Sequence, residues 1–201
     1  MAFRARCARS AAIVAVALAI GCGAASPHFY TLSSASGPAS GPPLASRPEL
    51  GLAVGPLSFP QYLDRPELVT RDGSHRLIVA DAHRWGGSMR SDILRVVADD
   101  LGRLLGTARV AVYPTDPAFA ADYRVLLEVR EFEGVPGEKV RLRALWTIAP
   151  TGAGGTPTIQ ESIVEQPIAS KSYEDLVSAE SVALGTVTRT IAEALVGLPG
   201  R

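Results

Sequence analysis

The sequence has too few of several residue types to build the commonest catalytic or metal sites. Of its 201 residues only two are cysteine, Cys7 and Cys22, and the three histidines, His28, His75 and His83, do not cluster. A zinc site needs three or four convergent nitrogen or sulfur ligands. The H-E-x-x-H, C-x-x-C, G-x-S-x-G and P-loop patterns are also missing. We therefore expect no metal site, no cofactor and no enzymatic activity.

An excess of charge is missing as well. Lysine and arginine number 20, aspartate and glutamate number 20, and the net charge is zero. Nucleic-acid-binding domains usually carry a basic excess, so we expect no nucleic-acid partner. The hydrophobic fraction of 47% and the charged fraction of 20% are ordinary for globular proteins. The composition therefore predicts a folded core.

No apolar stretch reaches the roughly 20 residues needed to cross a bilayer as a helix. The apolar run Ala11–Ile20 follows Arg4, Arg6 and Arg9. A positive start, a short apolar run and small residues after it are typical of a secretory signal. A buried N-terminal helix is the alternative, but the charges flank one side only and Gly21 and Gly23 interrupt the run.

The residues around Cys22 predict a lipoprotein signal. Cys22 follows the small residue Gly21, as in signals that are cut before an acylated cysteine, although Leu18 stands one place earlier than the usual leucine. After cleavage Cys22 would have no disulfide partner, and a lipid such as diacylglyceryl with palmitate would protect its thiol. An ordinary signal cut near residues 24–26 is the alternative.

The composition divides the chain into three parts. Residues 1–21 are the predicted lipoprotein signal peptide, and residues 22–48 are the predicted lipidated N-terminus and spacer. Residues 33–48 are rich in Ser, Gly and Pro, which is typical of a flexible tether. The aromatic and β-branched residues at 28–32 indicate a short strand that could dock on the domain. Residues 49–201 form the predicted folded domain.

Hydrophobic periodicity predicts two main helices in this domain. One begins at Ser88 or Ser91 and ends at Gly106, and the other runs from Ser172 to about Val196, with Ser172 and Asp175 as a capping box. Alternating residues predict strands at 50–55 (stopped by Pro56), 67–71, 76–82, 109–113, 124–130, 140–148 and 159–168. This order predicts an α/β fold: a mixed, partly antiparallel sheet packed with two main helices.

Two polar-aromatic clusters are candidates for binding. They are residues 59–66 and 82–85, both at strand ends, where loops often present binding groups. Tyr, Trp and Arg carry much of the energy at interfaces, but local packing explains the same residues equally well. Asp81 and His83 share one face of their strand. They could be a simple carboxylate–imidazole pair or the start of a Ser-His-Asp triad, although no serine is placed beside them.

The run Leu52–Pro66, with its prolines and its Tyr62-Leu63-Asp64-Arg65 segment, resembles the PqiC-like family of ABC-type transport auxiliary lipoproteins. Residues 68–71 continue the family pattern. His83-Arg84-Trp85 match the next motif, whereas the Ala-Glu-Pro that usually follows is replaced by Gly86-Gly87-Ser88.

The resemblance implies an anticodon-binding-like α/β sandwich that works beside an ABC permease and an MCE-domain protein in lipid transport. It implies an outer-membrane lipoprotein that faces the periplasm, anchored through acylated Cys22. Candidate residues for docking the partner are Tyr62, Leu63, Arg65, His83, Arg84 and Trp85. Self-association remains open.

An alternative is an envelope lipid-binding or structural lipoprotein that acts without a transporter. An apolar cavity between sheet and helices would favour it, and a filled core would favour docking.

Overall fold

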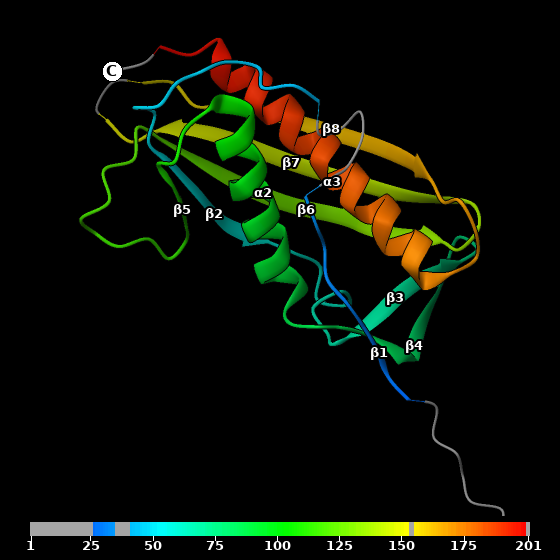
Figure 1. Cartoon of the computed structure of the whole chain (residues 1–201). Helices are drawn as coiled ribbons and strands as arrows, with labels where there is room; N and C mark the ends of the chain where they lie inside the picture. The colour runs from blue at the N-terminus through cyan, green and yellow to red at the C-terminus, as the bar shows by residue number, and fades with distance from the viewer. Residues whose placement is uncertain (1–25, 35–40, 153–154, 200–201) are drawn as a thin grey trace, which may run out of the picture.

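Two long helices and two β-sheets make up the fold (Figure 1). The computed structural model describes residues 26–34, 41–152 and 155–199, so the predicted signal peptide and Cys22 lie outside the described residues. The elements in chain order are β1 (His28–Tyr30), β2 (Leu52–Ser58), β3 (Glu67–Asp72), β4 (Arg76–Trp85), α2 (Met89–Leu105), β5 (Val110–Val112), β6 (Tyr123–Val135), β7 (Lys139–Pro150), β8 (Thr158–Pro167) and α3 (Tyr173–Val196). The predicted mixed α/β fold with two helices is confirmed. The division of the strands into two sheets was not predicted.

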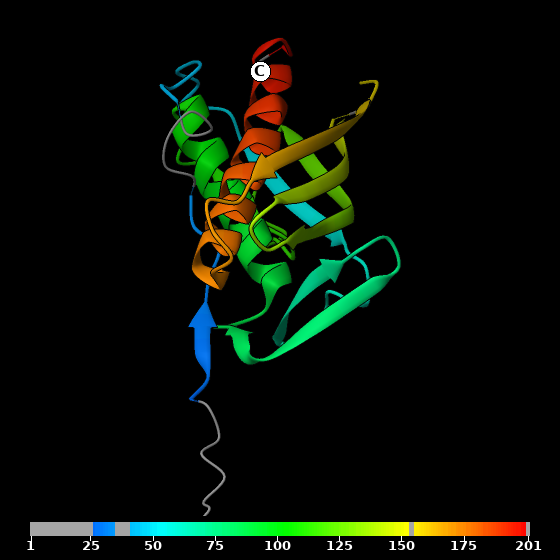
Figure 2. The same ribbon diagram turned by 90° about the vertical axis from the view of Figure 1, so that its right-hand side faces the viewer.

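The larger sheet has the strand order β5-β2-β6-β7-β8. Strand β2 pairs in parallel with β5 and β6, and β6, β7 and β8 pair antiparallel. Figure 2 shows α2 and α3 together on one face of this sheet. Alternate residues of β6 and β7, such as Val125, Leu142 and Trp146, point toward the helices and are fully buried. The alternation seen in the sequence therefore marks the face that the helices cover.

Strand β2 continues through Pro56, so the prediction that this proline stops the strand was wrong. The pairing of β2 with β6 shifts register between Val54 and Leu57. Gly55 there has a φ of 106°, which favours glycine, and Pro56 is exposed. A bulge is one of the few places in a sheet that tolerates a proline. The strand resumes after the bulge and ends at Ser58.

The helix ends agree with the capping signals in the sequence. Gly106 ends α2 in the left-handed conformation with a φ of 62°. The Ser172 hydroxyl accepts a hydrogen bond of 3.1 Å from the backbone N–H of Asp175 at the start of α3. Both helices begin at the same end of the molecule, where β1 and β4 lie (Figures 1 and 2). With 24 residues, α3 extends about 36 Å from that end.

The smaller sheet has the order β1-β4-β3 and lies at the end of the molecule where both helices begin. Strand β1 runs parallel to β4, and Tyr30 pairs with Trp85. Further along the chain, the segment 41–49 lies against the opposite end of α2, where the N–H of Leu44 donates to the carbonyl of Leu104 over 2.8 Å. No helix within the described ranges is long and apolar enough to cross a membrane.

Candidate functional site

The loop 59–66 between β2 and β3 is a closed turn held by its own backbone. The N–H of Leu63 donates to the carbonyl of Pro60 over 3.0 Å, and the N–H of Asp64 donates to Gln61 over 3.2 Å. The side chain of Leu63 is only 3% exposed and belongs to the hydrophobic core. The buried Leu63 side chain therefore anchors the loop to the core, and the polar residues beside it form the outer surface of the loop.

Tyr62 lies in this loop but directs its hydroxyl inward. Its Oη donates to Glu133 Oε2 over 3.0 Å, and Glu133 is only 4% exposed. Arg71 of β3 donates to the other carboxylate oxygen, and the backbone N–H of Phe132 donates to Oε2 over 2.9 Å. Burial and the neighbouring Glu133 carboxylate raise the pKa of Tyr62. These hydrogen bonds join the loop and β3 to β6, so the Tyr62 side chain stabilises the packing of the loop on the sheet.

The burial of Glu133 could not be predicted from the sequence, because the alternation of buried and exposed residues along β6 shifts just before this position. The pairing of β6 with β7 shifts register between Val129 and Glu131, and both Phe132 and Glu133 are buried after the shift. Strict alternation would place one of two adjacent residues outside. The only local signal is the repeated Glu-x-Glu of residues 131–133 ahead of Gly134, which does not reveal an irregularity in the sheet.

Arg65 and Arg84 do come together, through a residue that the sequence did not single out. Arg65 Nε lies 3.0 Å from Glu67 Oε2, and an Arg84 terminal nitrogen lies 3.4 Å from Glu67 Oε1. The hydrogen bond from Arg65 leads the effects that lower the pKa of Glu67. The side chains of Arg65 and Arg84 are 41% and 43% exposed. These three residues, which we call the Arg65–Glu67–Arg84 patch, carry one net positive charge on the surface.

Trp85 and His83 alternate with Arg84 along β4. Trp85 is 5% exposed and packs in the core, while its backbone N–H donates to the carbonyl of Pro66 over 2.8 Å. Asp81 is exposed, and His83 is engaged elsewhere. The Trp85 side chain therefore lies in the core, and the His83 ring is occupied by contacts within the domain.

His83 is part of an aromatic cluster that joins β1, β4 and α3. Its Nδ1 lies 2.8 Å from the hydroxyl of Tyr30, and its ring stacks on Tyr173 with centroids 3.9 Å apart and on His28 at 5.3 Å. Burial and the neighbouring His28 lower the pKa of His83, while burial and Glu174 raise the pKa of Tyr30. The cluster therefore attaches β1 to the domain through both β4 and α3.

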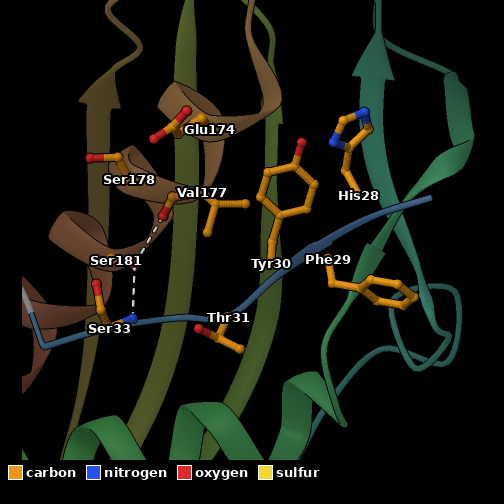
Figure 3. Close-up of a pocket in the computed structure, with 9 residues that line it drawn as sticks. All are labelled: His28, Phe29, Tyr30, Thr31, Ser33, Glu174, Val177, Ser178 and Ser181. Atoms are coloured by element: carbon orange, nitrogen blue, oxygen red, sulfur yellow. Dashed lines mark hydrogen bonds between the residues drawn. The ribbon is translucent and has the colours of Figure 1, made fainter. Parts of the chain in front are cut away.

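A pocket of about 490 Å³ lies between β1 and the first turns of α3 (Figure 3). Residues 28–31 and Ser33 form one wall, and Glu174, Val177, Ser178 and Ser181 form the other. The Ser181 hydroxyl accepts from the N–H of Ser33 over 3.2 Å and donates to the carbonyl of Val177 over 2.9 Å. Hydroxyl and carboxylate groups dominate the walls. The pocket therefore differs from the mostly apolar cavities that hold lipid-like ligands.

Comparison with known proteins places the chain in a family. Residues 30–192 match the family described as ABC-type transport auxiliary lipoprotein component, so the chain belongs to that family. The resemblance drawn from Leu52–Pro66 and His83–Trp85 is thereby confirmed. The chain is an auxiliary lipoprotein component of an ABC-type transport system of the cell envelope.

Two solved structures share the fold. An uncharacterised protein is 15% identical with a TM-score of 0.69, and the alignment covers 85% of this chain and 99% of that one. A protein from Xanthomonas campestris is 19% identical with a TM-score of 0.63, over 85% of this chain and 95% of its own. No curated protein sequence matches significantly.

Proposed function

We propose that this lipoprotein serves an ABC/MCE-type lipid transport system, and that it holds the transport assembly at the outer membrane from the periplasmic side. The observation that carries the proposal is the family match over residues 30–192, which begins eight positions after a cysteine in a lipoprotein signal context. A diacylated or triacylated Cys22 anchors stably, whereas one acyl chain binds a membrane only marginally.

The proposed docking surface is the Arg65–Glu67–Arg84 patch. Arginine is among the residues that carry most binding energy at interfaces, and both arginines keep about two fifths of their side-chain surface exposed. The other candidates contact the rest of the fold. The Tyr62 hydroxyl donates to Glu133, and the side chains of Leu63 and Trp85 are buried in the core. Their contribution to docking is to hold the loop in shape.

Direct lipid carriage is the alternative, and the packing disfavours it. The space between the large sheet and the helices is filled by side chains that are at most 1% exposed, including Leu104, Trp146, Val187 and Ile191. A second pocket of about 310 Å³ lies against β2, β6 and β7, where it includes the outward-facing Leu126, Leu145 and Thr147. This packing between the helix layer and the sheet therefore disfavours an enclosed site for an acyl chain.

Mass spectrometry of the membrane-extracted protein tests the anchor, and co-purification tests the partner. We expect a mature chain that begins at acylated Cys22 and copurifies with an MCE-domain protein and an ABC permease. The Cys22→Ser variant should be released into the soluble fraction. A mature N-terminus at another residue, or purification without any transporter subunit, would contradict the proposal.

Charge reversal tests the docking surface. Arg84→Glu and Arg65→Glu should weaken copurification, because each places a second carboxylate beside Glu67 and reverses the charge that the partner meets. Arg76→Glu is the matched control, since Arg76 is 73% exposed and pairs with Asp72 in the same sheet. Equal recovery of the partner with all three variants would remove the patch from the docking surface.

A further inference from the structure

The N-terminal segment is fixed to the folded domain from the short strand predicted within residues 28–32, ahead of the predicted flexible stretch 33–48. Leu32 is 1% exposed and belongs to the hydrophobic core, and its carbonyl accepts a hydrogen bond of 2.8 Å from Arg95 of α2. One residue later, the N–H of Ser33 donates to Ser181 of α3. The segment around Leu32 is therefore held by both helices at once.

Strand β1 is held as well. The N–H of Gly86 donates to the carbonyl of Tyr30 over 2.7 Å, and the Tyr30 hydroxyl is bonded to His83. These contacts add to the parallel pairing of β1 with β4. The first residue that the sheet holds is therefore His28, six positions after Cys22.

Chain length then limits how far this end of the domain can lie from the membrane. Six residues span at most about 20 Å when fully extended. Part of that span crosses the polar headgroup layer, which is about 5–8 Å thick on each side of a bilayer. The end of the domain that carries β1 therefore stays close to the lipid surface if Cys22 is acylated.

The docked strand also decides which end faces the lipid. Were residues 28–33 all free, the next backbone-to-backbone hydrogen bond to the domain in the described part of the chain would be that of Leu44, whose N–H donates to Leu104 at the far end of α2. That anchor is 22 positions after Cys22, which allows a span of up to about 75 Å from the opposite end of the molecule. The contacts of β1, together with those of Leu32 and Ser33, thus shorten the tether and place the other end of the domain nearest the membrane.

A large apolar side chain is exposed on β1, close to the point where the N-terminal tether joins the domain. Phe29 is 64% exposed, the highest value among the large hydrophobic residues of the described part of the chain. Figure 3 shows its ring on the opposite side of the strand from the rings of His28 and Tyr30. Phenylalanine is among the apolar residues that interfacial segments bury at the boundary between headgroups and acyl chains, and Phe29 is seven positions from the predicted acyl group.

We propose that β1 orients the domain on the membrane, with the start of β1, the end of β4 and the starts of both helices toward the bilayer and Phe29 in contact with lipid. This rests on the proposed acylation of Cys22. The occupant of the Phe29 surface is a lipid interface, because the short tether brings that surface to the bilayer. Phe29 pairs in register with Arg84, so the transport partner would meet the Arg65–Glu67–Arg84 patch beside the membrane.

A single environment-sensitive label tests the orientation. The lipidated Phe29→Cys protein, labelled with an NBD fluorophore, is reconstituted alone into vesicles of phosphatidylethanolamine and phosphatidylglycerol. Ile163→Cys is the matched control, because Ile163 is 52% exposed on β8, away from β1. Cys22 itself does not react when its sulfur carries lipid. Mass spectrometry of each sample establishes the acylation separately.

We expect the emission at position 29 to shift to the blue and to be quenched by lipids with spin-labelled acyl chains, while position 163 keeps the emission of a label in water. Equal emission at the two positions in acylated protein would overturn the orientation and leave the proposed anchor standing. A protein without acyl groups would overturn both. A blue shift at position 29 in Cys22→Ser protein without vesicles would show contact between copies of the chain and also overturn the lipid assignment.

Discussion

Glu180 of α3 should make the stability of the folded protein depend on pH. Its side chain is 2% exposed, and one of its oxygens has no hydrogen-bond partner among the described residues. Burial, reinforced by the charge of nearby Glu133, raises the pKa of Glu180 well above its ordinary value. The folded protein therefore keeps this carboxyl protonated at pH values where the unfolded chain has lost the proton.

The sign of the effect follows from proton linkage. The stabilisation is complete below the unfolded pKa of about 4.3 and is lost as pH rises toward the folded pKa. Over that pH range the folded state binds up to one more proton than the unfolded chain. The folding equilibrium constant therefore falls by up to about tenfold for each unit by which the pH rises. Asp100 adds a slope of the same sign, because burial also raises its pKa. Glu180→Gln should remove the first contribution and keep the second.

Urea unfolding between about pH 5 and pH 8, followed by tryptophan fluorescence, measures both slopes. Trp85 and Trp146 are buried and report the transition. The Glu180→Gln variant should show a flatter decline of unfolding free energy with pH than the native chain. Glu174→Gln is the control on the same helix, since Glu174 is exposed and should leave the slope unchanged. An identical slope in Glu180→Gln and native protein would mean that Glu180 is ionised in the fold, and the reasoning would be refuted.

Three further substitutions test the packing described above. Tyr62→Phe removes a hydrogen bond to the buried Glu133 carboxylate and should lower the unfolding free energy by about 2 kcal/mol in urea titrations; no change would mean that the hydroxyl is not a brace. Leu32→Ala should cost about 3 kcal/mol in the attachment of the N-terminal segment, so that proteases cut there first, whereas unchanged proteolysis would contradict the attachment. Trp146→Phe empties part of the core and leaves Ser162 without its 2.9 Å donor, at an expected cost of about 2 kcal/mol by thermal melting. A melting temperature like that of the native chain would count against a filled interior.

The helices and the long strands could be predicted because their signals are local. The apolar stripe that includes Ile93, Val97 and Leu104 already specifies a helix with one buried face, and Ser172 and Gly106 mark helix ends through capping geometry. Alternation in residues 140–148 likewise specifies a strand with one dry face. These patterns depend on the chain's own period and need no knowledge of neighbours.

The candidate residues could be predicted, but their surroundings could not. The residue types of the 59–66 loop, together with Arg84, indicated a candidate binding site. Nothing in the sequence predicted that Arg65 and Arg84 both pair with Glu67. The sequence left docking and local packing as equal alternatives for these residues, and the structure buries the side chains of Leu63 and Trp85. Exposure depends on which elements pack above a residue, and those elements come from distant parts of the chain.

By itself the sequence determined the kinds of element, their order, and the helix ends marked by Gly106 and Ser172, because hydrophobic period and capping act within a few residues. Only the tertiary structure decided that the strands divide into two sheets, that β2 passes through Pro56 at a bulge, and that Glu133 is buried beside Arg71. It also decided that β1 docks beside β4 and shortens the tether. Each of these depends on pairing between segments far apart in the chain, and strand partners are chosen by the packing of the whole molecule.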